Sequence, residues 1–150
     1  WYEVTGVQTC ALPIYELLMI KGVTKELYYG TEESPGIRKY LTVYGTGTIN
    51  INTAPGVVLM ALADDITEEM VSNMEEFRKD KLNTLSDSSW YRGVPGMDGI
   101  TISPSLISVK SNIFSITSTG ILNSMSRKIS SVVERDSGKK TVQILSWEVD

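Results

Sequence analysis

The stretch ININTAPGVVLMALADDITEEMVSNMEEFR, residues Ile49–Arg78, decides the fold of the chain. At its start Ile49 and Ile51 alternate with Asn50 and Asn52, which is the period of a half-buried β-strand. The residues that follow combine helix-capping side chains with apolar side chains at helical spacing. The stretch therefore predicts one strand followed by two short helices.

The first helix is predicted over about 54–62. Thr53 offers a hydroxyl that can cap it, and Pro55 stands where a helix tolerates a missing backbone N–H. Its apolar side chains are expected to close on the second helix: Val58, Leu59 and Leu62.

The second helix is predicted to begin at Asp65, whose carboxylate can cap it. Glu68 stands three residues further on and completes the pattern of a capping box. Four apolar residues then share one face at spacings of four, four and three: Ile66, Met70, Met74 and Phe77.

Upstream of this stretch, 15–21 is predicted to be helical and to end at Gly22. Thr24 can cap a second turn over 25–28, and the polar segment 31–36 is predicted to be a loop. Residues 37–44 favour extended structure, and 41–44 is predicted to pair with 49–51 in a small hairpin.

Downstream, 79–98 is predicted to be a loop with one irregular helical turn, in which Trp90 packs against the helices. Apolar and polar residues then alternate in segments separated by turn residues, and 136–139 has the composition of a hairpin turn. The last third therefore predicts a meandering antiparallel sheet with one polar face. Its strands are expected around Ile107–Val109, Phe114–Thr117, Ile129–Val133 and Val142–Ile144.

Composition limits the function classes. The 150-residue chain is 41% hydrophobic and has no run of about 18 apolar residues that could span a membrane. A net charge of −4 with scattered lysines and arginines disfavours a nucleic-acid partner. The chain has no histidine and a single cysteine, Cys10, which excludes histidine-based catalysis, imidazole metal ligands and an internal disulfide. Because its many serines lack an evident base, an enzyme is not expected.

The motif Asn50-x-Asn52-Thr53-Ala54-Pro55, followed by two helices and a closing Arg78, resembles the helix-hairpin-helix class. Two families of that class are similar to the chain: DNA-binding proteins of the competence type, and the minor pseudopilin K of type II secretion. The DNA-binding version has Gly-x-Gly between its helices, so that backbone N–H groups approach a phosphate. Here the connection is 63–67, where Asp64 and Asp65 oppose a phosphate and no glycine permits close approach.

The C-terminal strands favour the pseudopilin. Segments 108–120, 132–135 and 144–148 look like the last strands of pseudopilin K, and 16–27 resembles the part of that family that precedes the Asn-x-Asn-Thr-Ala motif. The resemblance implies an α+β fold, with a helical SAM-like or helix-hairpin-helix domain at 15–98 and a pilin-type antiparallel sheet at 99–150.

That resemblance also implies a role. Pseudopilin K is a non-enzymatic component at the tip of the type II secretion pseudopilus, where its partners are the minor pseudopilins of the I and J types. It is periplasmic and anchored in the inner membrane by a long N-terminal helix. That helix and the early part of the sheet are absent from this sequence, so an exposed strand edge is expected. The alternative is a DNA-binding protein of the competence type.

A calcium site is a further question, because the pseudopilin K family is associated with calcium. The densest acidic cluster is Asp64, Asp65, Glu68 and Glu69. These residues lack EF-hand spacing and a glycine at the required bend, and the family's ligands do not map onto them. A helix cap and a solvated helix face are the predicted roles, and no cofactor is expected.

The N-terminus resembles no protein family. Residues Val4–Ile14 look like the in-frame translation of a widely used DNA-sequencing adapter. We therefore interpret 1–14 as an artefactual extension and exclude it from the prediction of the fold.

Overall fold

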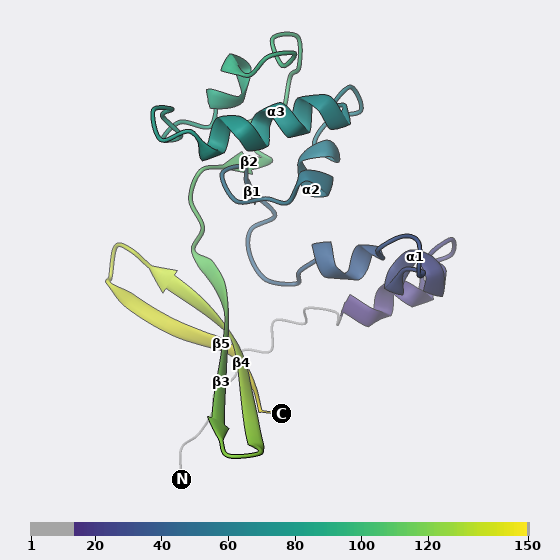
Figure 1. Cartoon of the computed structure of the whole chain (residues 1–150), viewed down its shortest axis with the longest axis vertical. Helices are drawn as coiled ribbons and strands as arrows, with labels where there is room; N and C mark the ends of the chain where they lie inside the picture. Colours follow the sequence, from purple (N-terminus) through teal and green to yellow (C-terminus); the bar gives the residue numbers. More distant parts are fainter. Residues whose placement is uncertain (1–13, 150) are drawn as a thin grey trace. The chain divides into compact units, whose positions relative to one another are not determined.

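The computed structural model describes residues 14–149 and shows a mixed α+β protein with short helices and a three-stranded antiparallel sheet (Figure 1). The chain divides into two compact units, Trp1–Tyr44 and Gly45–Asp150. In the described part, no helix has both the length and the apolar character needed to cross a membrane. Most of the adapter-like stretch, including Cys10, lies outside the described residues.

The first unit contains three short helical elements. The predicted helix at 15–21 takes the 3-10 form as η1 (Ile14–Met19), and α1 follows at Lys25–Tyr29. The predicted cap is confirmed, because the Thr24 hydroxyl accepts a hydrogen bond from the Leu27 backbone N–H at 3.1 Å. Gly22 lies between the two elements with a φ of +99°, which glycine adopts without strain.

A tight loop connects α1 to η2 (Ile37–Tyr40), a 3-10 helix. A Cβ atom at Gly30 would lie 2.4 Å from the backbone nitrogen of Gly36, so the two chain segments approach at a distance that only glycine allows. The loop prediction is confirmed, but the extended structure predicted for 37–44 is wrong over 37–40. Preference for extended structure acts through packing between strands, and no described strand pairs with this segment.

The second unit begins with two strands that pair in parallel, β1 (Ile49–Asn50) and β2 (Ile107–Ser108). The Ile49 N–H donates to the Leu106 carbonyl at 2.8 Å, and the Ile51 N–H donates to the Ser108 carbonyl at 2.9 Å. The predicted hairpin of 41–44 with 49–51 is therefore wrong, and Ile107 does not belong to the C-terminal meander. Pairing β1 with β2 buries Ile51 and Ile107 in one core, which a local hairpin with exposed Leu41 and Val43 would not achieve.

Helices α2 (Gly56–Met60) and α3 (Glu68–Lys79) follow β1. Both predicted caps are wrong. Pro55 occupies the N-cap of α2, and no side chain caps that helix. Thr67 caps α3, with its hydroxyl 3.3 Å from the Met70 N–H, and not Asp65. Helix α3 starts late because Ile66 is buried in the turn before it.

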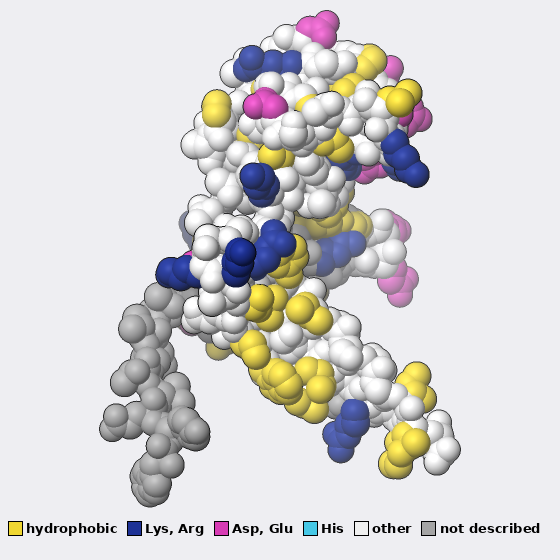
Figure 2. All heavy atoms as spheres, turned by 90° about the vertical axis from the view of Figure 1, so that its left-hand side faces the viewer, with side chains coloured by type: hydrophobic (Ala, Val, Ile, Leu, Met, Phe, Trp, Pro, Cys, Tyr) yellow, Lys and Arg dark blue, Asp and Glu magenta, His cyan; other side chains and the backbone are white. Residues whose placement is uncertain are grey.

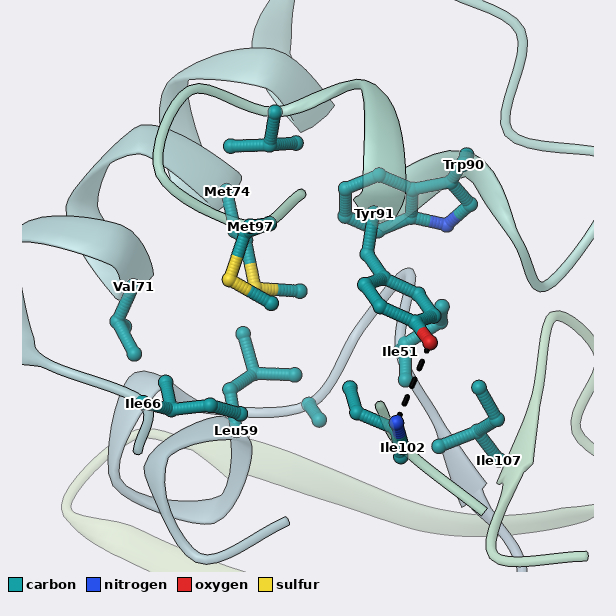
Figure 3. Packing of buried hydrophobic residues seen from close by; sticks show 12 residues of the cluster. Ile51, Leu59, Ile66, Val71, Met74, Trp90, Tyr91, Met97, Ile102 and Ile107 are labelled. Carbon is teal, nitrogen blue, oxygen red and sulfur yellow. Dashed lines mark hydrogen bonds between the residues drawn. The ribbon is translucent and has the colours of Figure 1, made fainter. Parts of the chain in front are cut away.

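The core of this unit is one cluster contributed by both helices, β2, η3 (Trp90–Gly93) and the segments that connect them, as Figure 3 shows. The Tyr91 hydroxyl accepts a hydrogen bond from the Ile102 N–H at 3.3 Å, which pairs a buried polar atom. The predicted closure of α2 on α3 is confirmed, because Leu59 is in the cluster and Val58 and Leu62 pack against it. The cluster consists of Ile51, Ala54, Leu59, Ile66, Val71, Met74, Trp90, Tyr91, Val94, Met97, Ile102 and Ile107.

The C-terminal sheet is the predicted antiparallel meander. Its strands are β3 (Ile113–Leu122), β4 (Met125–Asp136) and β5 (Thr141–Val149), in the order β3-β4-β5. The predicted hairpin turn is confirmed at Asp136, whose carboxylate accepts from the backbone N–H groups of Gly138 and Lys139. These bonds, that from Lys139 above all, hold the pKa of the Asp136 carboxyl below its ordinary value.

Candidate functional site

The two asparagines of the Asn-x-Asn-Thr-Ala motif have their side chains turned into the second unit. The Asn50 side-chain NH₂ group donates to the Ser111 hydroxyl at 2.8 Å, and the Asn50 Oδ1 atom accepts from the Asn52 backbone N–H at 3.0 Å. The Asn52 amide donates to the Leu85 carbonyl at 2.9 Å. Asn52 Oδ1 accepts from Trp90 Nε1 at 2.8 Å. The motif therefore joins β1 to segments that lie 33 to 61 residues further along the chain.

Arg78 closes the same network from the end of α3. Its guanidinium donates to the Ala54 carbonyl at 2.9 Å and to the Ile51 carbonyl at 3.3 Å, and its side chain is only 13% exposed. Glu75 lies 3.7 Å away with its side chain 41% exposed to solvent, so this ion pair is expected to add little. Arg78, which belongs to α3, thus holds the turn that connects β1 to α2.

The remaining motif residues form that turn. The N–H groups of Thr53 and Ala54 both donate to the Asn50 carbonyl, so the chain reverses before Pro55. Ala54 is buried in the core cluster. The sequence motif is therefore a structural unit whose polar groups bind other parts of the same chain, and the described residues contain no buried side-chain N or O atom without a partner.

Trp90 was predicted to pack against the helices, and this prediction is confirmed. Its indole ring stacks on the Phe77 ring, with centroids 5.5 Å apart and planes 5° apart. Since Trp90 also bonds Asn52, it connects the loop after α3 to the motif. Sequence reasoning could not identify this hydrogen bond, because 38 residues separate the two side chains.

The acidic candidates for calcium all lie exposed around the turn before α3. Asp64, Asp65, Glu68 and Glu69 each face solvent. Within the described residues, no three or more Asp, Glu, His or Cys side chains are grouped so that they could hold a metal ion. These four residues therefore carry no proposed site.

A hollow of about 550 Å³ lies beside the β4–β5 hairpin. Its lining is polar and carries both signs of charge, including Glu134, Arg135 and Lys139. Ligand pockets are usually apolar with a few converging polar groups, which does not describe this hollow. We assign it no ligand.

The sheet carries the most unusual surface of the described chain. Residues directly opposite each other on paired strands point to the same face, so the register assigns every side chain to one of two faces. One face is mainly polar, as predicted, with Ser115, Thr117, Ser130, Glu134, Gln143 and Glu148, and it also carries Ile113, Ile121 and Val132. The other face carries eight exposed large apolar side chains: Phe114, Ile116, Leu122, Met125, Val142, Ile144, Trp147 and Val149.

We call these eight residues the apolar face. Their exposed fractions lie between 38% and 67%, and among the residues of the three strands Val133 alone is buried. Figure 2 shows hydrophobic side chains gathered over the sheet, in the lower part of that view. Gly120 and Arg127 lie between the pair Leu122 and Met125 and the other six residues of the face. Exposed apolar side chains gathered on one face of a sheet mark a place where another element docks. The alternation of residues in the sequence indicates this face, but not that the described residues leave it uncovered.

No protein-family model, no curated protein and no solved structure matches the chain.

Proposed function

We propose that the chain is part of a minor pseudopilin similar to the K type, a non-enzymatic component at the tip of the type II secretion pseudopilus. Such a protein supports export of folded proteins across the outer membrane. The observation that carries the proposal is the apolar face on a three-stranded antiparallel sheet, next in the chain to a well-packed helical unit. The resemblance implies a long N-terminal apolar helix, and we propose that this helix covers the apolar face.

The dimensions of the apolar face suit one helix. Its strands have 10, 12 and 9 residues. At about 3.3 Å per residue and about 4.8 Å between strands, they form a strip roughly 30 Å long and about 10–15 Å wide. A helix is about 10–12 Å in diameter and reaches 30 Å in 20 residues. A single helix laid along the strip would therefore cover it.

The helical part of the second unit, which contains β1, α2, α3 and η3, favours a packing role over nucleic-acid binding. The polar groups of its motif bind within the chain, and Asp64 and Asp65 are exposed where a phosphate would approach. We accordingly propose a SAM-like packing domain and a pilin-type sheet as the finer description of the fold. The proposed partners are minor pseudopilins of the I and J types, in the periplasm, with the complete protein anchored in the inner membrane.

The proposal predicts that Ile144→Asp acts differently in two chains. In this 150-residue chain Ile144 is exposed, so we expect the midpoint of thermal unfolding to change little. In the complete protein, encoded by the full upstream reading frame, a helix would bury this carboxylate. Recovery of the complete Ile144→Asp protein together with co-expressed I-type and J-type pseudopilins should then fall at least about tenfold, because burying an unpaired charge costs several kcal/mol.

Gln143→Asp provides the matched control, since Gln143 is the neighbouring residue on the polar face. It should leave both unfolding and partner recovery unchanged. Equal recovery of all three complete proteins would contradict the proposed covering of the apolar face. An upstream frame that encodes neither a prepilin leader nor a long apolar segment would contradict the function itself.

A second prediction concerns nucleic acid. In an anisotropy titration with labelled duplex DNA at low salt, we expect binding weaker than about 10⁻⁴ M, the weak end of non-specific affinities. The reason is the acidic, glycine-free connection between α2 and α3. Binding in the micromolar range that weakens steeply with salt would favour the competence-type alternative instead.

A further inference from the structure

The outer edge of β3 is free within the described chain. The sheet has the order β3-β4-β5, so β3 and β5 each expose one edge, and no described strand pairs with either. A free edge presents backbone N–H and C=O groups that can bind another strand. The two edges differ in how well they are protected against such binding.

The register shows which backbone groups of β3 point outward. The Arg135 N–H donates to the Asn112 carbonyl at 2.7 Å, which makes these two residues a hydrogen-bonded pair. Hydrogen-bonded and non-bonded pairs alternate along an antiparallel ladder. The backbone groups directed away from β4 are therefore those of Ile113, Ser115, Thr117, Thr119 and Ile121.

The usual protections of an edge strand are missing from β3. Charged side chains, prolines and bulges normally prevent strand addition. No charged residue and no proline stands between Lys110 and Arg127, a stretch that contains all of β3. By contrast, β5 contains Glu148, and a register shift opposite Val132 and Val133 interrupts its pairing with β4. Of the two edges, β3 is thus the one open to another strand.

We propose that the β3 edge binds the β3 edge of a second copy of this chain, antiparallel and with Thr117 opposite Thr117. This inference goes beyond the proposed function and does not rest on it. The outward-directed residues have odd numbers. A two-fold axis perpendicular to the sheet at Thr117 therefore places odd-numbered residues of one copy opposite odd-numbered residues of the other. The polar faces of the two copies then lie on the same side of the combined sheet. No charges of like sign meet in this register, because β3 has none.

The same register pairs a bulky side chain with an open position. Phe114 lies opposite Gly120 of the second copy, and a Cβ atom at Gly120 would meet nothing within 4 Å. An aromatic side chain opposite a glycine at a sheet edge covers the exposed backbone. Ile113 and Ile121 also pair, and Ser115 lies opposite Thr119. Pairing β3 with itself is therefore complementary along nearly the whole strand.

Sedimentation of the complete 150-residue chain over a range of concentrations tests the proposal. We expect a reversible monomer–dimer equilibrium that Thr117→Lys weakens at least about tenfold, because lysine on an edge strand opposes strand addition. Ser130→Lys is the matched control: Ser130 lies directly opposite Thr117, on the same face, but in the central strand. It should leave the dimerisation constant within about twofold.

A cross-link tests the register. In a Cys10→Ser background, Thr117→Cys should form a disulfide-linked dimer under mild oxidation, since hydrogen-bonded opposite residues have Cα atoms about 5.5 Å apart, within the range for disulfides. Ser130→Cys should remain monomeric under denaturing conditions. A chain that stays monomeric at all concentrations would overturn the proposal. So would association that both lysine variants leave unchanged, which would assign it to the apolar face.

Discussion

Replacing Arg78 with alanine is expected to lower the free energy of unfolding of the second unit by about 2–4 kcal/mol. The guanidinium donates to the carbonyls of Ile51 and Ala54, and both residues belong to the buried core. A hydrogen bond to a charged group contributes about 1.5–3 kcal/mol, and a buried acceptor left without a donor adds to the loss. Chemical denaturation followed by circular dichroism measures the change.

Two variants separate the guanidinium from its charge and its helix. Arg78→Lys keeps the charge but not the planar fork that reaches two carbonyls, so an intermediate loss is expected. Lys79→Ala removes the neighbouring, exposed charge of the same helix and should change stability by no more than about 0.5 kcal/mol. If Arg78→Ala and Lys79→Ala proved equally mild, the guanidinium would not hold the turn after β1.

The sequence predicted the elements of this unit better than their connections. The strand at 49–51, the two helices and the packing of Trp90 follow from local periodicity and apolar spacing, which the sequence displays directly. The parallel pairing of β1 with β2 joins residues 58 positions apart. Partner choice at that separation depends on which arrangement buries Ile51 and Ile107, and no local pattern contains this information.

The predicted N-cap residues of α2 and α3 were wrong for a related reason. Asp65 and Thr67 are both good N-cap residues; Thr67 caps the helix, and Ile66 between them is buried in the preceding turn. The N–H groups of Thr53 and Ala54 bond the Asn50 carbonyl in a turn, and α2 begins only after Pro55, so Thr53 lies too early in the chain to cap the helix. Tertiary packing decides among local options of nearly equal energy.

For the candidate surfaces too, the sequence predicted local features but not the contacts between distant parts of the chain. Alternation in the last third of the sequence predicted a sheet with one polar face, and the register confirms it. The described residues leave the opposite, apolar face exposed, which the alternating pattern could not predict. The Asn-x-Asn-Thr-Ala motif was predicted from resemblance, whereas its hydrogen bonds to Leu85, Trp90 and Ser111 required the fold.

The other large effect is expected at Trp90, which is 7% exposed. Trp90→Ala should lower the free energy of unfolding by about 3–5 kcal/mol, because it removes a large buried ring and leaves a cavity. The lost contacts include the stack on Phe77 and the hydrogen bond to Asn52. Trp147→Ala is the matched control: Trp147 is 60% exposed on the apolar face, so its loss should be far smaller.

Trp90→Phe distinguishes packing from hydrogen bonding. A phenyl ring can keep the stack on Phe77 but leaves Asn52 Oδ1 without its donor, so a loss of about 1–2 kcal/mol is expected. In a double-mutant cycle with Asn52→Ala, the coupling energy should be about 0.5–3 kcal/mol, the range for residues in one hydrogen-bond network. Additive losses would show that Trp90 and Asn52 stabilise the unit independently. Coupling would instead show that the Trp90 indole N–H and the Asn52 side chain act together in holding the loop after α3, in addition to the bond from Asn52 to the Leu85 carbonyl.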